Sequence, residues 1–449
     1  MLDQSFSAAN FRKIIDIENR KGNYLEAEFF PDAEKKAQKI QASKNELRSL
    51  RKNKAKYTKE EFETKISESS ADLESLKEEK EKMLLAELEA ASEEIGSKGF
   101  SFEIEEVDVG KPQKAFIAKR NASTFFAMKQ LQHNIRRLYK VKQANRHEIV
   151  CQIRELLGDG FPKYVIRTDI TSFYESIPRK QLLKKLRDDP LLTLASKKLI
   201  RRVLFEYSGL TGSADVGLPR GIGISAYLAE LYMRDIDRAI RDYPGVLFYA
   251  RYVDDIFIIF CPPPNVGTIR FRRAIASAFK KLELKRNRTK TEIFKLGQSQ
   301  SLSVQYLGYK FTFDTGSIEL KMTDKKIGRY KQRIDLSFSA YDKKSKKSEK
   351  NARALLEKRV RFLTGNTRLV NNKKNVVSGV FFSNSLLSNL DDLDELDSYL
   401  AAKISTLTSA RLRARLSQHS FKNGFQTRKY HKFSARDLSQ IVEVWKHVS

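Results

Sequence analysis

The middle of the chain alternates short apolar, β-branched runs with polar turns. Residues 246–250 and 256–260 are two such runs, and the tetrapeptide Tyr252-Val253-Asp254-Asp255 lies between them. This pattern predicts a β-hairpin with two carboxylates at its tip. Adjacent carboxylates repel one another, so they are best tolerated where a divalent cation neutralises them. Polar hairpin turns also contain Asp-Asp often, so the tetrapeptide by itself leaves a purely structural turn open.

A third acid follows another strand pattern, 85 residues before Asp254. The short run over residues 165–168 is rich in β-branched side chains and ends in Asp169. A strand that ends in one acid, together with a distant hairpin that carries two more, is typical of a two-metal phosphoryl-transfer site.

Helical patterning dominates the N-terminal region. Residues 32–95 contain neither Gly nor Pro. Thr58 and Glu61 have the spacing of a capping box, so we expect two antiparallel helices that meet near residues 54–57 and share a sparse coiled-coil seam. Two interpretations remain open for this hairpin: a solvated spacer, or an arm that docks protein or RNA.

Three further motifs surround the acids in a fixed order. A Pro- and Gly-rich loop over 217–225 precedes the hairpin, and segments 287–292 and 304–310 follow it. This order resembles the reverse transcriptases, whose palm runs from a strand-end Asp through a Leu-Pro-x-Gly loop and Tyr-x-Asp-Asp to a Lys-Thr loop and a Leu-Gly hairpin. The resemblance covers about residues 140–320.

The resemblance implies an α+β right-hand polymerase fold with fingers, palm and helical thumb, and with the helical hairpin as an N-terminal insertion. The expected parts are an N-terminal segment over 1–31, the hairpin over 32–98, fingers over 99–163, a palm with fingers elements over 164–321, and a basic helical thumb with a C-terminal RNA-binding region over 322–449.

The composition of the chain indicates what kind of partner it binds and in which compartment it acts. The 449 residues carry a formal net charge of +29, which predicts a polyanionic partner but names no chemistry. Cys151 and Cys261 lie far apart without a Cys/His cluster, which argues against zinc and disulfides and fits a reducing cytoplasm. We see no signal peptide and no run approaching the ~18 apolar residues of a membrane span.

The resemblance also assigns the chemistry. Reverse transcriptases hold two Mg²⁺ ions, with Mn²⁺ as a substitute, on acids that correspond to Asp169 and Asp254. Asp255 would complete the acidic pocket, and the carbonyl of Ile170 is an expected additional ligand. Lys290 is a candidate acid for the departing pyrophosphate, with a solvated lysine as the alternative.

Several residues are candidates for binding the incoming dNTP. Tyr174 matches the aromatic ring that excludes a 2′-hydroxyl, because strand alternation would direct only one of Phe173 and Tyr174 into the site; the alternative is a core tyrosine. Arg220 stands where the family usually has Gln, which puts its nucleotide contact in doubt, and Gly221 permits close backbone approach. The basic residues Lys142 and Arg146 are weaker candidates for contacting the triphosphate.

The last segments predict contacts to nucleic acid. Tyr306, Leu307 and Gly308 should form the primer grip. Residues 405–436 hold eight Lys and Arg and no acid, and this region fits an RNA-binding surface. Its expected contacts are Arg411, Arg413, Arg415, Phe425 and Tyr430, together with Phe421 and Phe433. The competing interpretation is that these aromatics pack into the thumb core and the charges only aid solubility.

Among reverse transcriptases, the chain looks most like the bacterial defence-associated (antiphage) group, with a palm similar to retron and group II intron enzymes. The segments 4–6, 361–368 and 377–382 resemble the smaller enzyme of its third class. That resemblance implies a structured non-coding RNA template, a DNA product, a second reverse transcriptase partner and a higher-order assembly in the bacterial cytoplasm. Template-independent synthesis and a catalytically idle RNA-binding scaffold are the alternatives.

Overall fold

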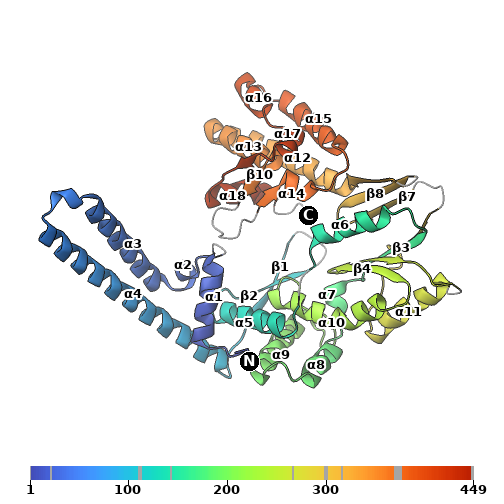
Figure 1. Ribbon diagram of the computed structural model, residues 1–449, viewed down its shortest axis with the longest axis horizontal. Coiled ribbons are helices and arrows are strands. Elements are labelled where there is room, and N and C mark those ends of the chain that lie inside the picture. The colour runs from blue at the N-terminus through green and yellow to red at the C-terminus, as the bar shows by residue number, and fades with distance from the viewer. Residues whose placement is uncertain are drawn as a thin grey trace. The chain divides into compact units, whose positions relative to one another are not determined.

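The computed structural model describes residues 2–20, 23–109, 114–141, 144–264, 267–297, 302–314, 317–368 and 377–445. The chain divides into two compact units: unit 1 comprises residues 1–107, 115–142 and 177–231, and unit 2 comprises 108–114, 143–176 and 232–449. Both contain helices and strands (Figure 1), which confirms the α+β class. Within the described ranges, no helix is both long and apolar enough to cross a membrane.

A helical hairpin forms the N-terminal part of unit 1 (Figure 1). Helices α3 (Pro31–Lys52) and α4 (Lys59–Gly96) pack against each other around a 3-10 turn, Lys54–Lys56. The expected capping box is present, because the Thr58 side chain accepts a hydrogen bond from Glu61 N and the Glu61 carboxylate accepts one from Thr58 N. Fully buried residues of α4 occur only in its C-terminal third: Leu84, Leu88, Ala91 and Ile95.

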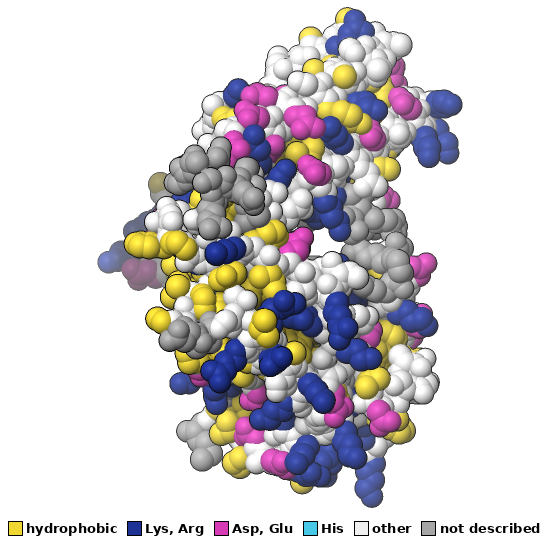
Figure 2. Space-filling model, turned by 90° about the vertical axis from the view of Figure 1, so that its right-hand side faces the viewer, with side chains coloured by type: hydrophobic (Ala, Val, Ile, Leu, Met, Phe, Trp, Pro, Cys, Tyr) yellow, Lys and Arg dark blue, Asp and Glu magenta, His cyan; other side chains and the backbone are white. Residues whose placement is uncertain are grey.

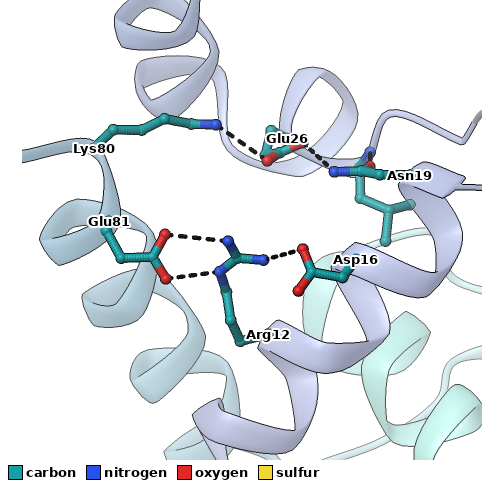
Figure 3. A network of polar contacts seen from close by, with 7 residues as sticks. Arg12, Asp16, Asn19, Glu26, Lys80 and Glu81 are labelled. Atoms are coloured by element: carbon teal, nitrogen blue, oxygen red, sulfur yellow. Dashed lines mark hydrogen bonds and ion pairs between the residues drawn. The ribbon is translucent and has the colours of Figure 1, made fainter. Parts of the chain in front are cut away.

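A polar network ties the first two helices, α1 (Ala8–Arg20) and α2 (Leu25–Phe29), to α4 (Figure 3). The Arg12 guanidinium lies 2.7 Å from Glu81 Oε1 and 2.6 Å from Asp16 Oδ1. Glu26 accepts hydrogen bonds from Asn19 at 2.9 Å and Lys80 at 3.2 Å. Glu81, followed by Asp16, raises the pKa of Arg12.

The rest of unit 1 combines residues 99–107 and 115–142 of the expected fingers with residues 177–231 of the expected palm range. Strands β1 (Ile104–Val107) and β2 (Ala115–Ala118) pair antiparallel. The surrounding helices are α5 (Ala122–Leu138), α8 (Arg179–Asp188), α9 (Leu194–Thr211) and the first part of α10 (Gly223–Arg241).

Unit 2 is built on a four-stranded antiparallel sheet in the order β4-β5-β3-β6. Its strands are β3 (Lys163–Thr168), β4 (Val246–Tyr252), β5 (Asp255–Phe260) and β6 (Glu292–Leu296). The central strand β5 is buried from Ile256 to Phe260. Such a continuous run of β-branched and aromatic side chains suits a strand that is covered on both faces.

Two helices accompany this sheet in unit 2. α11 (Thr268–Lys281) stacks Phe271 on Phe260 of β5, with ring centroids 4.1 Å apart. α6 (Arg146–Leu157), which lies in the range expected for the fingers, buries Ile149, Val150, Ile153 and Leu157 in the core of unit 2.

A second sheet of unit 2 shares that core. Strands β7 (Leu302–Tyr306), β8 (Tyr309–Asp314) and β9 (Ser317–Met322) form an antiparallel meander, and the Leu307–Gly308 turn joins the first two. Phe257 of the four-stranded sheet packs on Tyr306, with centroids 4.9 Å apart. The Leu-Gly hairpin predicted from the sequence is therefore present.

The C-terminal part of unit 2 is helical. A small sheet in the order β11-β10-β12 lies among its helices and consists of β10 (Asn366–Arg368), β11 (Val377–Gly379) and β12 (Tyr430–His431). The apolar core of this C-terminal part is formed by buried side chains that are distributed along the chain between Met322 and Trp445. The helices are α12 (Asp324–Ser345), α13 (Glu349–Thr364), α14 (Val380–Asn384), α15 (Asp391–Ser405), α16 (Ala410–Leu416), α17 (Phe421–Gln426) and α18 (Ala435–Val442).

Candidate active site

Three acids lie at one end of the four-stranded sheet, and we call them the acidic edge: Asp169, Asp254 and Asp255. Asp255 begins β5, Asp254 occupies the preceding turn, and Asp169 directly follows β3. Because Thr168 of β3 pairs with Ile256 of β5, the next residues outward on both strands reach the same end of the sheet.

The acids of this edge act on one another electrostatically. Burial raises the pKa of Asp255, the charges of Asp254 and Asp169 raise it further, and Arg167 opposes the rise. Asp169 Oδ1 is buried and has no hydrogen-bond partner among the described residues. A buried carboxylate oxygen without a partner is costly. Asp169 Oδ1 therefore has no cation or hydrogen-bond donor bound to it among the described residues.

Lys290 supplies a positive charge to the other carboxylate oxygen of Asp169. Its Nζ lies 2.6 Å from Asp169 Oδ2, and this hydrogen bond is the main cause that raises the pKa of Lys290. The loop that carries it is fixed to the strand end, because Asn287 N donates to the backbone carbonyl of Asp169 at 2.9 Å. Lys290 is thus brought to the acidic edge, while its role as an acid for pyrophosphate stays a prediction.

The residues of this edge fit a hard divalent cation. Such a cation takes carboxylate and carbonyl oxygens, and Asp169 Oδ1 is an available oxygen of that kind. The bridge between Ile170 and Arg286 is made through Asp169 O and Thr171 N, so it does not use the Ile170 carbonyl. Among the described residues, however, no three acid, His or Cys side chains stand close enough to form a complete metal-binding group.

A buried ion pair that the sequence analysis missed supports the Asp-Asp turn. Arg251 binds Asp237 of α10 through two hydrogen bonds of 2.8 Å, and Tyr249 Oη donates to the same carboxylate at 2.6 Å. Arg251 Nη1 also donates to the carbonyl of Val253 at 2.8 Å. The available signal was an arginine within the otherwise apolar strand β4, but its partner lies 14 residues away on a helix.

The turn itself has an uncommon backbone. Val253 has a φ of 60°, which is a costly conformation for a β-branched residue. Besides the Arg251 contact to Val253 O, the hydroxyl of Tyr306 donates to Asp255 O, two residues further on, at 3.1 Å. These two contacts hold the backbone that carries Asp254 and Asp255.

The proposed sugar-contacting aromatic lies in a helical turn. Phe173 and Tyr174 belong to α7 (Phe173–Ser176), so strand alternation was the wrong argument for separating them. The structure nevertheless separates them by burial, since Phe173 is 2% exposed and Tyr174 is half-buried. Their ring centroids lie 5.2 Å apart. The gate function of Tyr174 remains a prediction.

Arg220 and Gly221 lie in unit 1, whereas the acids lie in unit 2. Gly221 has a φ of 99°, and a Cβ there would come within 2.5 Å of the Phe116 carbonyl oxygen. Phe116 N in turn donates to Arg220 O at 2.7 Å. The predicted close approach is real, but the group approached is strand β2. Lys142 lies outside the described residues.

The primer-grip residues and Arg146 form one structural unit. Tyr306 is buried, Leu307 and Gly308 form the turn with φ values of 45° and 76°, and Arg146 Nε donates to Leu307 O at 2.8 Å. Arg146 was predicted to contact the triphosphate. The structure shows a different contact, in which its guanidinium binds the turn of the Leu-Gly hairpin, and contact with the triphosphate stays a prediction.

The predicted C-terminal aromatics divide between core and surface. Phe421 and Phe433 are buried in the helical core, and Phe425 is partly buried against it. The prediction of stacking surfaces is therefore wrong for Phe421 and Phe433, where the apolar core competes successfully for the rings. Tyr430 is 43% exposed and stays available for stacking.

The three predicted arginines of α16 differ in their contacts. Arg411 is exposed. Arg413 donates to the carbonyl of Leu407 at 2.5 Å, which gives it a local structural role. Arg415 lies 3.6 Å from Glu357. Only part of this set is therefore free to meet a polyanion.

A second group of cations near the acidic edge was also missed. Burial, followed by the charges of Arg272 and Arg288, lowers the pKa of Arg286. Within the described chain, none of these three arginines has an ion pair. Figure 2 shows many Lys and Arg side chains, interspersed with hydrophobic and acidic ones, on the face that it draws. The sequence signal that could have revealed this group of cations was the pair of arginines in Arg286-Asn287-Arg288, next to the segment that carries Lys290.

Residues 111–311 match the reverse transcriptase (RNA-dependent DNA polymerase) family. The match indicates an RNA-directed DNA polymerase, a nucleotidyltransferase, over these residues, and together with the mixed helices and strands it confirms the right-hand polymerase fold predicted from the motifs. Enzymes of this family copy RNA into DNA and use divalent metal ions. None of the curated proteins matches the chain.

Solved structures similar to this chain include two yeast telomerases. Apo telomerase from Candida tropicalis is 15% identical, over 72% of this chain and 54% of that one, with a TM-score of 0.35. Telomerase from Candida albicans in complex with a TWJ fragment of telomeric RNA is 11% identical, over 71% and 54%, with a TM-score of 0.31. The chain spans about half the length of these telomerase chains.

Proposed function

We propose that this protein copies a structured non-coding RNA into DNA in bacterial antiphage defence, acting in the cytoplasm with two Mg²⁺ ions for which Mn²⁺ can substitute. The observation that carries the catalytic part is the acidic edge, with its buried and unpartnered Asp169 oxygen. Asp169 and Asp254 would hold the metal ions, and Asp255 would add negative charge. When bound, the ions would lower the pKa of the primer 3′-hydroxyl and neutralise the triphosphate.

The chain's own residues would position that chemistry. Arg251 fixes the Asp-Asp turn through the Val253 carbonyl, and Tyr306 fixes Asp255 from the neighbouring sheet. Lys290, at 2.6 Å from Asp169, holds a proton next to the carboxylates and could deliver it to the leaving pyrophosphate after moving away from Asp169. Tyr174 would lie beneath the sugar and exclude a 2′-hydroxyl.

Two features favour a dedicated RNA and a larger assembly. The net charge of +29 supports a polyanionic partner that remains bound. The helical hairpin of α3 and α4 has few buried residues beyond its base, and we propose that it docks RNA or a second reverse transcriptase. This would agree with the smaller enzyme of the third class of defence-associated reverse transcriptases.

Sequencing the nucleic acids that copurify with the protein tests this proposal. We expect one abundant bacterial RNA and a DNA complementary to it, and we expect the DNA to be missing from an Asp254→Asn preparation that retains the RNA. Phage protection should be lost with the same substitution. DNA unrelated to any bound RNA would instead support template-independent synthesis, and wild-type protection by Asp254→Asn would support an idle scaffold.

Removing the hairpin tests the assembly. A protein in which residues 34–94 are replaced by a short Gly/Ser linker should retain primer extension on a generic template but lose mass in light scattering or affinity for the copurifying RNA. Unchanged mass, RNA affinity and phage protection would show that the hairpin is only a spacer.

A further inference from the structure

A cavity of about 470 Å³ opens among the C-terminal helices of unit 2. We call it the basic pocket, and the residues that define it come from α13, α16, the loop after α16, the segment before β12, and β12: Glu357, Arg361, Arg415, His419, Lys429 and His431. It contains three permanent cations, two imidazoles and one carboxylate. Such a concentration of positive charge around a cavity favours an anionic ligand.

The cations of the basic pocket are poorly neutralised. Arg415 meets the only carboxylate of the pocket, Glu357, at 3.6 Å. Lys429 has no ion pair among the described residues. Some lysines elsewhere in the same helical region are paired closely, as Lys331 is with Glu395 and Lys358 with Asp437, both at 2.6 Å. The cavity brings together three cations with a single carboxylate in its lining.

The two histidines of the basic pocket lie close to its positive charges. Arg361 Nη2 donates to His431 Nδ1 at 3.2 Å, and since a guanidinium only donates, this ring nitrogen carries no proton. His431 is 6% exposed, and the two imidazole centroids lie 6.2 Å apart. Burial, followed by Arg361, lowers the pKa of both His419 and His431 to about 4. The site keeps its histidines neutral chiefly because they are buried, and the nearby cations add to that effect.

We propose that the basic pocket binds a phosphate group of RNA through Arg361, Lys429 and Arg415. Guanidinium and ammonium groups are the side chains that bind phosphate most strongly. Tyr430 also lines the cavity and is 43% exposed, so it offers a ring on which the adjacent base can stack. Both a 5′-terminal phosphate and an internal phosphodiester fit this chemistry.

The choice of RNA as ligand rests on the proposed function, while anion binding by the pocket does not. A first experiment therefore uses inorganic pyrophosphate as the probe and needs no polymerase activity. The chain has only five histidines, so the imidazole signals of His419 and His431 can be followed by NMR. Pyrophosphate should raise the pKa of both, and Arg361→Gln should abolish the rise. Unaltered titration of both histidines at saturating pyrophosphate would overturn the proposal.

A second experiment identifies the source of the phosphate. Binding is measured for one RNA with a 5′-triphosphate and for the same RNA with a 5′-hydroxyl. Arg361→Gln and Lys429→Gln should each weaken binding about tenfold, because each removes one charge-assisted contact. Lys432→Gln is the matched control, since Lys432 is exposed, three residues from Lys429, and outside the pocket lining.

Each outcome has a defined meaning. If the variants weaken only the 5′-triphosphate RNA, the pocket binds a terminal phosphate; if they weaken both RNAs equally, it binds an internal one. If Lys432→Gln weakens binding as much as Lys429→Gln does, the effect is diffuse charge and the pocket proposal is wrong. Primer extension on a generic template, measured separately, shows whether the polymerase function stands or fails independently.

Discussion

The acidic edge and the basic pocket concentrate charge of opposite sign on different kinds of scaffold. The acidic edge stands on a β-sheet, where pairing of β3 with β5 brings a strand end and a hairpin turn together. The basic pocket stands on short helices and the two-residue strand β12. Sheet pairing fixes strand ends relative to each other, whereas a pocket between helices depends on how their side chains pack.

The two sites also differ in what balances their charge. At the acidic edge, Lys290 pairs with Asp169 but leaves one carboxylate oxygen without a partner. In the basic pocket, Glu357 meets only Arg415, and the imidazoles adapt by staying neutral. A carboxylate cluster of this kind suits metal ions, whereas a pocket of fixed cations suits phosphate. The difference predicts that the palm site is intolerant of substitution and the pocket only weakened by it.

The strongest test removes one acid from the acidic edge. Asp254→Asn should lower dNTP incorporation by about 10³-fold or more, because the lost charge stabilisation is worth several kcal/mol of the barrier. The thermal unfolding temperature should not fall, since one of several mutually repelling carboxylates becomes neutral. Asp188→Asn, on an exposed acid in unit 1, is the control and should leave incorporation unchanged. Near-wild-type incorporation by Asp254→Asn would refute the site.

The next test asks whether the Arg251–Asp237 ion pair only stabilises the fold or also positions the Asp-Asp turn for nucleotide incorporation. Arg251→Met leaves Asp237 as a buried charge without its partner, which should cost about 3–5 kcal/mol of unfolding free energy in denaturant titration. Adding Asp237→Asn should restore most of that stability and still accept the Tyr249 hydroxyl. Incorporation should stay low in the double variant, because the Val253 carbonyl remains unheld. Full recovery of activity would show that the pair is structural only.

A smaller effect is expected at the sugar-contacting position. Tyr174→Ala should raise the ratio of ribonucleotide to deoxyribonucleotide incorporation by about tenfold, since a steric barrier beneath the sugar is removed. Phe173→Leu is the control, because it alters the buried neighbour and leaves the half-exposed ring in place. An unchanged ratio in Tyr174→Ala would return that side chain to a packing role.

The smallest effect concerns pH and the basic pocket. The unfolded chain protonates its histidines near their ordinary pKa of 6.5, whereas folded His419 and His431 do so near 4. The unfolding free energy should therefore fall as pH drops from 6.5 to 4, by about 1–2 kcal/mol once solvent around the half-exposed His419 is considered. Pyrophosphate should reduce this fall. His419→Gln should remove part of it, and an identical pH dependence in wild type and variant would contradict the assignment.

The hydrophobic pattern determined the acidic edge almost completely, because a hairpin turn and a strand end are local features. Asp254 and Asp255 follow from two apolar runs with a polar tetrapeptide between them, and Asp169 follows from one more run. The capping box at Thr58 was equally readable, since its two residues are three positions apart. The resemblance to reverse transcriptase motifs was then enough to predict the order of the palm segments along the chain.

Contacts between distant segments were decided only by the tertiary structure. Arg146 binds Leu307 from 161 residues away, and Lys429 and Arg361 meet at one cavity although 68 positions separate them. Composition marked the C-terminal region as basic but could not distinguish the buried Phe421 from the exposed Tyr430. Periodicity reports which face of an element is apolar, whereas the partner of a charge depends on how the elements pack, and only the folded chain fixes that.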